Sequence, residues 1–278
     1  MAAPDPIGVA MALAREAGLK VQQPVSLRST NNTVVWLKPE PVVAKVGTAS
    51  YPRLQIELRV AQALCALGGP SVCPARQIAP VVHSRGGFDL TFWRYYAQDP
   101  QVDMAAEHVA AALRRLHLAL DRLAPSLRAT LPSYLTELDV IRSLLADNAA
   151  LPALAAADRD LLRRAFDSLR SQLLRLAPPQ SHVVLHGAPH AHNILVVDNE
   201  PIFIDFETTC VGPVEWDVAY LEPGTERCYG QPLQVELLRV CRAMTSVRTA
   251  VWCWADVERG DLREHAEWHL AQVKANHA

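Results

Sequence analysis

The chain has 278 residues, of which 50% are hydrophobic and 20% are charged, and its formal net charge at pH 7 is -2. A single hydrophobic core stops growing near about 250 residues, so this length suits one or two domains or lobes. The near-neutral charge provides no long-range field for nucleic acid or an anionic membrane, and we expect neither as a partner.

The N-terminal segment, residues 1–19, lacks the charged start, apolar block and cleavage site of a signal peptide. No other segment offers about 18 uninterrupted apolar residues, the length that a membrane helix needs. We therefore expect a cytoplasmic protein, whose oligomeric state the sequence leaves open.

The cysteines contain no Cys-x-x-Cys pair, and a disulfide scaffold is not expected in a chain of this size. We expect them to act as small buried hydrophobic residues. They are Cys65, Cys73, Cys210, Cys228, Cys241 and Cys253.

The N-terminal third of the chain predicts a small antiparallel sheet with helices. Apolar residues at helical spacing predict one helix over 7–18, which stops at Gly18, and another over 52–67, which stops before Gly68. Runs of β-branched residues between turn-forming groups predict short strands, the first three in a meander. These strands are expected over 21–27, 33–37, 41–46, 78–83 and 88–95.

From Asp103 onward the composition shifts to Ala, Leu and Arg, and helices dominate. Helical spacing predicts a long helix after Asp103 and further helices over 133–145 and 159–176. The change in composition places a boundary near 93–100. Strand signals in this part of the chain lie over 182–185, 194–197 and 202–206.

The densest group of functional residue types lies between residues 185 and 217. It contains His-Gly-Ala-Pro-His-Ala-His-Asn over 186–193 and Ile-Asp-Phe-Glu over 204–207. A hairpin with a short turn brings its outer ends together, so Asn193 and Asp205 are expected to present two hard oxygen ligands to one small space. Magnesium favours this arrangement, because it takes one or two protein oxygens together with waters and phosphates.

These segments resemble the His-Gly-Asp-x-x-x-x-Asn loop and the Ile-Asp-Phe-Glu signature of aminoglycoside phosphotransferases and related small-molecule kinases. The sequence Gly-Pro-Val-Glu-Trp-Asp-Val-Ala over 212–219 is similar to the continuation of that signature. The resemblance implies an α+β, bilobal protein-kinase-like fold. It implies a small antiparallel-sheet N-lobe with one helix over 1–96, a hinge near 92–99, and a larger, mainly helical C-lobe over 97–278 that carries the metal and acceptor sites.

The resemblance also implies roles for residues of the signature. Asn193 and Asp205 would hold Mg²⁺, and His186 would brace the loop. Asp217 would accept hydrogen bonds from the loop backbone and hold it in place.

On the nucleotide side, Lys45 resembles the strand lysine that contacts the α- and β-phosphates of ATP or GTP, and Glu57 resembles its ionic partner. Ser29, Asn31 and Asn32 occupy the place of the turn that covers the phosphates, without its usual glycines. These five residues are the cofactor-binding residues that we expect.

The position of the family's catalytic aspartate is occupied by Ala188, which cannot accept a proton from the acceptor hydroxyl. A general base contributes roughly 10²–10⁴-fold, while positioning and metal electrostatics supply most of the remaining acceleration. Turnover is therefore expected to be attenuated. His190, His192 and Glu207 are the nearest candidates to take over proton transfer.

The sequence predicts a phosphotransferase that uses ATP or GTP to phosphorylate a hydroxyl group of a small molecule. Acidic and basic residues over 222–274 are nearly balanced and do not favour a polycationic acceptor. One alternative is a nucleotide-binding pseudokinase that serves as a scaffold or sensor, which Ala188 favours. Another is a zinc-dependent hydrolase built on clustered histidines, although a glycine and a proline between them break any helix that would align them. The four histidines of this cluster are His182, His186, His190 and His192.

Overall fold

The computed structural model of the chain describes residues 5–29, 32–48, 53–98, 104–258 and 262–277. The chain divides into two compact units, which we call the first and the second unit. The first comprises Met1–Leu131 and Ala188–Thr209, and the second comprises Pro132–Gly187 and Cys210–Ala278. The expected lobes, 1–96 and 97–278, group the chain differently, and that division stays a prediction.

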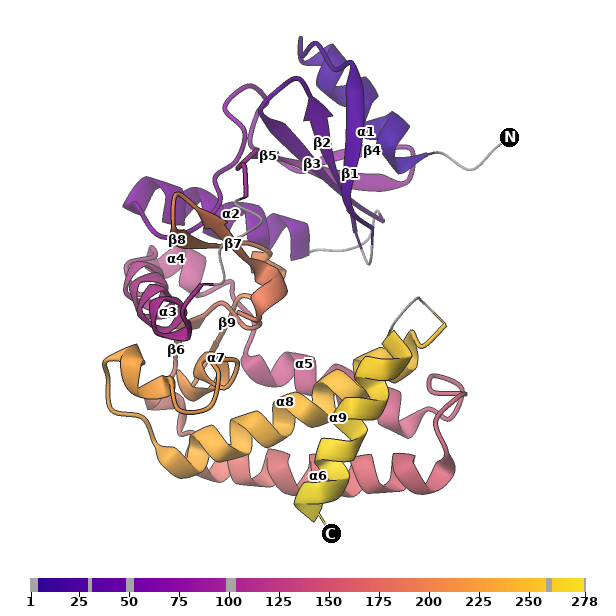
Figure 1. Cartoon of the computed structure of the whole chain (residues 1–278), viewed down its shortest axis with the longest axis vertical. Helices are drawn as coiled ribbons and strands as arrows, with labels where there is room; N and C mark the ends of the chain where they lie inside the picture. The colour runs from indigo at the N-terminus through magenta and orange to yellow at the C-terminus, as the bar shows by residue number, and fades with distance from the viewer. Residues whose placement is uncertain (1–4, 30–31, 49–52, 99–103, 259–261, 278) are drawn as a thin grey trace. The chain divides into compact units, whose positions relative to one another are not determined.

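A five-stranded antiparallel sheet lies in the first unit (Figure 1), with the strand order β1-β2-β3-β5-β4. Its strands are β1 (Gln23–Ser29), β2 (Thr33–Lys38), β3 (Val42–Thr48), β4 (His83–Arg85) and β5 (Phe88–Arg94). The predicted meander and the predicted strand over 88–95 are confirmed. The prediction of a strand over 78–83 is wrong, because Pro80 has no N–H for a ladder and β4 begins only at His83.

One face of this sheet is covered by helix α1 (Pro6–Glu16). Asp5 caps the helix by accepting hydrogen bonds from two backbone N–H groups of the first turn. Ala10 and Ala14 are fully buried against alternate residues of β2 and β3, where a small side chain permits close packing. Because successive strand residues point to opposite faces, Lys45 of β3 faces away from α1.

The remaining elements of the first unit are three helices, a hairpin and two 3₁₀ turns. They are α2 (Arg53–Leu67), α3 (Ala106–Leu120), α4 (Pro125–Arg128), η2 (Ala191–Asn193), β7 (Ile194–Val197), β8 (Glu200–Phe203) and η3 (Phe206–Thr208). Asp198 and Asn199 have positive φ values of 53° and 62°, as a two-residue hairpin turn requires. The strand predicted over 202–206 begins two residues earlier and ends at Phe203, because Asp205 adopts a left-handed conformation, with φ 68°, that cannot continue a strand.

The second unit is mainly helical, and Figure 1 shows α8 and α9 lying against each other. Its elements are α5 (Tyr134–Ala146), α6 (Ala156–Leu176), η1 (Pro179–Ser181), β6 (Val183–Leu185), β9 (Cys210–Gly212), α7 (Glu215–Val218), η4 (Glu226–Tyr229), α8 (Val235–Ala255) and α9 (Leu262–His277). The helices predicted over 133–145 and 159–176 are confirmed. Strand β9, which pairs with β6, was not anticipated, because three residues are too few to show a periodic pattern. No helix in the described ranges is long and apolar enough to span a membrane.

A disulfide joins Cys65 and Cys73, so the expectation of unbridged buried cysteines is wrong for this pair. The turn after α2 brings their Cα atoms to 5.6 Å, a separation that a disulfide can span. Cys210, Cys241 and Cys253 are buried, as expected, and form no disulfide, and the unbridged Cys228 is half-buried.

Close packing at Gly212 generates a stability prediction. A Cβ atom at this position of β9 would lie 2.9 Å from the ring of Tyr134, which is buried in the core of the second unit. We expect Gly212→Ala to destabilise the protein by about 1–3 kcal/mol, because the ring has to shift. Urea unfolding measures the change, and an unaltered midpoint would show that the core accommodates the methyl group.

Candidate active site

The side chain of Lys45 is the centre of a buried ionic group in the first unit. Its Nζ atom lies 2.9 Å from Glu57 Oε2, 2.8 Å from Asp205 Oδ1 and 2.6 Å from Glu207 Oε1. Lys45 comes from β3, Glu57 from α2, and the other two carboxylates from the segment after β8. The ion pair between Lys45 and Glu57 that the resemblance implied is therefore present, and two further carboxylates join it. We call these four residues the Lys45 cluster.

The Lys45 cluster shifts the proton affinities of Lys45 and Glu57. Burial by itself lowers the pKa of Lys45, but the charges of Glu57, Asp205 and Glu207 together raise it above its ordinary value. Burial raises the pKa of Glu57 to about 8, which the charge of Lys45 opposes and the charges of the other two carboxylates reinforce. Three carboxylates around one ammonium leave an excess of negative charge when all are ionised.

Asn32, from the turn predicted to cover the phosphates, contacts the same cluster. Asn32 Nδ2 donates a hydrogen bond of 2.7 Å to Glu207 Oε1. Gly47 permits this approach, because a Cβ atom there would lie 2.7 Å from Asn32 Oδ1. Ser29 ends β1 and does not line the cleft described below, whereas Asn31 lies outside the described residues.

The metal-site prediction concerns the two ends of the β7–β8 hairpin. Ile204 N–H donates to the backbone oxygen of Asn193 at 3.0 Å, so the residue before Asp205 pairs directly with Asn193. Asn193 Nδ2 donates to Ala188 O at 3.1 Å, but Asn193 Oδ1 is buried and has no hydrogen-bond partner among the described residues. A buried amide oxygen without a donor suits a cation ligand.

A cleft of about 570 Å³ lies entirely within the first unit and contains the Lys45 cluster on its surface. Most other lining side chains are apolar or aromatic. Several lining residues fall in predicted functional segments, namely Trp93, Arg94, Tyr95, Tyr96 and Gln98 in the hinge expected near 92–99 and Ile204 in the signature. Lining residues that the sequence did not nominate include Leu27, Arg28, Val34, Val43, Val72 and Leu195. Leu27 and Arg28 directly precede the turn that was predicted to cover the phosphates. Their position in the sequence could therefore have identified them as residues of the cleft.

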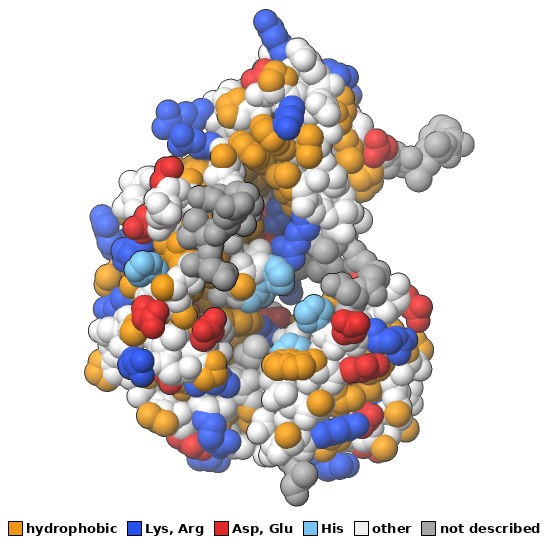
Figure 2. All heavy atoms as spheres, viewed as in Figure 1, with side chains coloured by type: hydrophobic (Ala, Val, Ile, Leu, Met, Phe, Trp, Pro, Cys, Tyr) orange, Lys and Arg blue, Asp and Glu red, His pale blue; other side chains and the backbone are white. Residues whose placement is uncertain are grey.

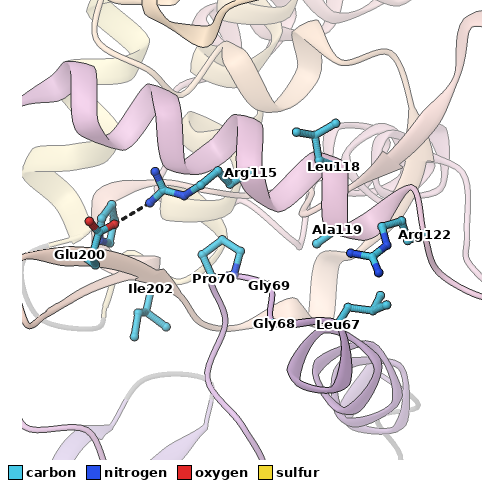
Figure 3. A pocket seen from close by; sticks show the side chains of 11 residues that line it. Leu67, Gly68, Gly69, Pro70, Arg115, Leu118, Ala119, Arg122, Glu200 and Ile202 are labelled. Carbon is cyan, nitrogen blue, oxygen red and sulfur yellow. Dashed lines mark hydrogen bonds and ion pairs between the residues drawn. The ribbon is translucent and has the colours of Figure 1, made fainter.

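A second hollow of about 400 Å³ lies elsewhere in the first unit (Figure 3). Its residues come from the turn after α2, from α3 and from β8, and Arg115 at its edge pairs with Glu200 at 2.6 Å. None of the predicted site residues lines it. We therefore assign the candidate active site to the cleft.

In the second unit, Asp217 holds the start of the signature loop. Its carboxylate accepts hydrogen bonds from His186 N–H at 2.7 Å and from Gly187 N–H at 2.9 Å. Trp216 Nε1–H donates to Gly187 O at 3.2 Å. The backbone-holding contacts expected of Asp217 are present, and His186 is completely buried beside them.

The loop then continues through Ala188 into the first unit. The carbonyl of Ala188 accepts from His190 N–H at 2.9 Å as well as from Asn193. His190 Nε2 lies 3.3 Å from Asn193 Nδ2, and the rings of His190 and His192 have centroids 6.0 Å apart. Of these two histidines, His192 lines the cleft.

The histidine cluster that would support a zinc hydrolase does not form a ligand group. Within the described ranges, the candidate metal ligands that converge within 4.8 Å of one another are Glu57, Asp205 and Glu207, and no histidine is among them. His182 instead contacts the ring of Tyr134 and the carbonyl of Ala177. These oxygen ligands suit a hard cation better than zinc.

A comparison with known protein families agrees with the chemistry of the site. The model of the phosphotransferase enzyme family (APH) matches residues 22–239, and the chain belongs to that family. No curated protein sequence matches the chain significantly.

Solved structures share the fold at low sequence identity. A spectinomycin phosphotransferase in complex with ADP and spectinomycin is 15% identical, with a TM-score of 0.71 over 98% of this chain and 94% of that one. A choline/ethanolamine kinase family protein from Mesorhizobium loti is 19% identical, with a TM-score of 0.66 over 96% and 94%. An amicoumacin kinase in complex with AMP-PNP, Ca²⁺ and Ami is 14% identical, with a TM-score of 0.72 over 96% and 93%. The predicted kinase-like α+β fold is confirmed.

The raised pKa of Glu57 generates a pH prediction. Between the ordinary pKa of 4.5 and the folded value of about 8, the folded protein binds more protons at Glu57 than the unfolded chain does. The contribution of Glu57 to stability is therefore complete below the lower pKa and is lost as the pH rises through the higher one. We expect Glu57→Gln to flatten the fall in unfolding free energy across this range.

Urea unfolding at several pH values measures this slope. The matched control is Glu200→Gln, since the side chain of Glu200 is 67% exposed, and this variant should keep the wild-type slope. An equal slope in Glu57→Gln and wild type would contradict the assignment.

Proposed function

We propose that the protein is a magnesium-dependent phosphotransferase that transfers the terminal phosphoryl group of ATP or GTP to a hydroxyl group of a small molecule. The observation that carries the proposal is the Lys45 cluster, in which one ammonium faces three carboxylates on the surface of a largely apolar cleft. Membership of the phosphotransferase enzyme family supports the reaction class.

The shape and chemistry of the cleft suit a nucleotide. Its volume of about 570 Å³ lies in the range of small-molecule sites, roughly 300–1,000 Å³. Val34, Val43 and Ile204 offer apolar contacts to a purine ring. Lys45 would contact the phosphates, and Asn32 would cover them.

Glu57 and the other two carboxylates have different proposed roles. Glu57 is buried on α2 and bonds Lys45 through both oxygens, at 3.0 and 2.9 Å, so it would keep the ammonium oriented. Phosphate oxygens would replace Asp205 and Glu207 as partners of Lys45. Those two carboxylates would then be available to a cation.

The residues present fit a magnesium ion. Asn193 offers the buried, unsatisfied Oδ1, and Asp205 offers a carboxylate that is 32% exposed. These two residues would hold Mg²⁺, with phosphate oxygens and waters as the other ligands. Bound Mg²⁺ would supply electrostatic stabilisation of the charge on the transferred phosphoryl group.

The proposed acceptor is a small hydroxyl compound. Structural relatives are described with spectinomycin or as choline/ethanolamine kinases, which suggests a small hydroxyl compound. On the face that Figure 2 shows, red acidic and blue basic side chains are interspersed, and the sequence over 222–274 is nearly balanced in charge. This balance does not favour a polycationic acceptor.

Ala188 favours a second candidate function, a nucleotide-binding pseudokinase that acts as a scaffold or sensor. Such a protein would retain Lys45, Asn193 and Asp205 but would not transfer phosphate. His192 lines the cleft and is exposed, so within the enzyme proposal it is a candidate to accept the hydroxyl proton.

The metal and nucleotide half of the proposal predicts the effect of Asp205→Asn. Loss of this charge should weaken magnesium-dependent binding of ADP at least about tenfold, because the cation loses its carboxylate ligand. Isothermal titration calorimetry with and without Mg²⁺ measures the change. The matched control is Asp198→Asn, an exposed aspartate on the same hairpin that also has positive φ, 53° against 68°. Equal weakening in both variants, or binding without any dependence on Mg²⁺, would contradict the proposal.

The acceptor half predicts the effect of Ala188→Asp. Ala188 is half-buried, so the larger side chain can be accommodated. A restored general base should increase phosphate transfer by roughly 10²–10⁴-fold, measured as nucleotide turnover against a panel of hydroxyl compounds. Nucleotide binding without turnover in both wild type and Ala188→Asp would instead favour the pseudokinase.

A further inference from the structure

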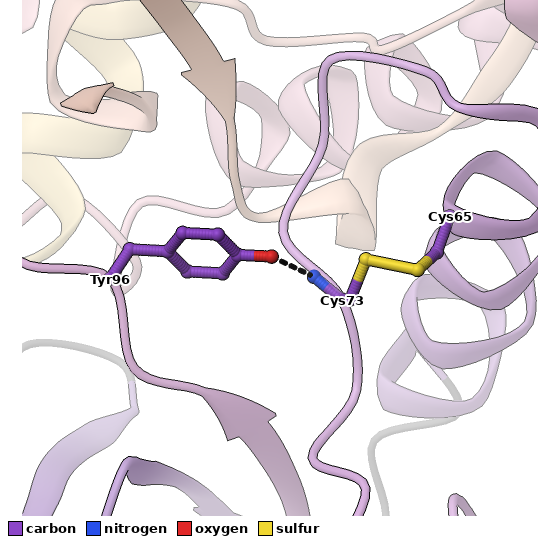
Figure 4. Close-up of a disulfide and its surroundings, with 3 residues drawn as sticks. All are labelled: Cys65, Cys73 and Tyr96. Carbon is purple, nitrogen blue, oxygen red and sulfur yellow. Dashed lines mark hydrogen bonds between the residues drawn. A yellow bond between two sulfur atoms is a disulfide. The ribbon is translucent and has the colours of Figure 1, made fainter. Parts of the chain in front are cut away.

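The disulfide joins helix α2, which carries Glu57 of the cleft, to the segment that contains Val72 of the cleft. Figure 4 shows the two cysteines with Tyr96. Cys65 lies in the last turns of α2 and is exposed, whereas Cys73 is half-buried in the segment that follows α2. We call residues 70–73 the bridged segment.

The backbone of Cys73 is bonded to the wall of the cleft. Its N–H group donates to Tyr96 Oη at 3.2 Å, and its C=O group accepts from Arg94 N–H at 2.9 Å. Tyr96 and Arg94 both line the cleft. A displacement of Cys73 would therefore disturb two residues of that wall.

The bridged segment is also bonded to β8. Val72 N–H donates to Phe203 O at 3.2 Å, and Phe203 N–H donates to Pro70 O at 2.9 Å. Val72 itself lines the cleft, and Phe203 stands two residues before Asp205. The bridged segment thus connects the aromatic wall of the cleft with the strand that leads to the proposed metal ligand.

At the other end of the disulfide, helix α2 carries Glu57. Glu57 lies roughly two turns before Cys65 on this rigid element and holds Lys45 through both carboxylate oxygens. The disulfide is consequently a covalent tie between the helix that orients Lys45 and the segment that supports the cleft wall.

We propose that Cys65 and Cys73 form a reversible thiol–disulfide site whose oxidised form strengthens nucleotide binding. In the reduction, a thiolate of a small dithiol attacks Cys65 Sγ, forms a mixed disulfide and releases Cys73 as a thiol after protonation. The second thiol of the reagent then releases Cys65 as a thiol. The protein disulfide gains two electrons and two protons, and the dithiol becomes a cyclic disulfide.

The exposure of the cysteines makes this chemistry selective. Cys65 is accessible, whereas Cys210 and Cys241 are buried, and burial raises the pKa of both thiols well above the ordinary value. Buried protonated thiols react slowly, because the thiolate is the nucleophile. Oxidants and reductants of low molecular mass should therefore act first on the Cys65–Cys73 pair.

The covalent link between α2 and the bridged segment determines whether oxidation strengthens or weakens nucleotide binding. With the disulfide formed, α2 and the bridged segment are held in the arrangement described, and nucleotide binding has less motion to suppress. With the disulfide reduced, only non-covalent contacts hold them together, and binding-competent arrangements are a smaller fraction of the population. We expect reduction to weaken nucleotide affinity by roughly threefold to tenfold.

The experiment uses the full chain, which is equilibrated with either oxidised or reduced dithiothreitol. Peptide mass spectrometry establishes whether Cys65 and Cys73 are bridged, and calorimetry measures the affinity for ADP with Mg²⁺. The double variant Cys65→Ser/Cys73→Ser should bind ADP as weakly as the reduced protein under both conditions. Cys228→Ser, which alters a free half-buried thiol, should keep the wild-type response.

Equal affinity of the bridged and reduced proteins would overturn the inference, as would free Cys65 and Cys73 thiols in the oxidised sample. Because the affinity readout rests on the proposed function, hydrogen exchange of the nucleotide-free protein provides a separate one. Reduction should accelerate exchange at the Val72, Cys73 and Arg94 amides. If neither form binds ADP, the proposed function fails. If the amides exchange equally fast in both forms, the inference that the disulfide stabilises the cleft wall fails as well.

Discussion

The structure of the first unit depends on the ion pairs of the buried Lys45 ammonium. A buried charge is costly unless it is paired and hydrogen-bonded, so the fold has to bring carboxylates to β3 from elsewhere in the chain. Glu57 arrives on α2, while Asp205 and Glu207 arrive from the segment after β8. The strand alternation that turns Lys45 away from α1 therefore determines which helix and which hairpin must meet the sheet.

The surplus of carboxylates explains why this cluster is more than a structural ion pair. One glutamate would be enough to balance Lys45. Burial raises the pKa of Glu57 to about 8, and the negative charges of Asp205 and Glu207 reinforce this shift. Such a site is poised to accept additional positive charge. Asn193 Oδ1 is a second buried polar group, and it accepts no hydrogen bond from the described residues. The divalent cation proposed to accompany a nucleotide would account for both observations.

Support for the site comes from hydrogen bonds to the backbone rather than from the reacting groups themselves. Asp217 fixes the start of the loop through His186 and Gly187, and the bridged segment fixes the cleft wall through Tyr96. Rigid support of this kind keeps ligands within a small tolerance of their working geometry. The absence of an acidic side chain at position 188 leaves that support unchanged, because the residue's carbonyl is the atom that accepts from Asn193.

The sequence by itself determined the order of the elements, the family resemblance, and the residue types at Lys45, Glu57, Asn193 and Asp205, because periodicity and short motifs are local properties. Only the tertiary structure decided that Glu207 bonds Lys45 and Asn32, although it is 162 residues from Lys45 along the chain. It also decided that Cys65 and Cys73 are bridged, since spacing alone does not give the direction of their side chains. Contacts between distant segments depend on packing, and no local pattern records them.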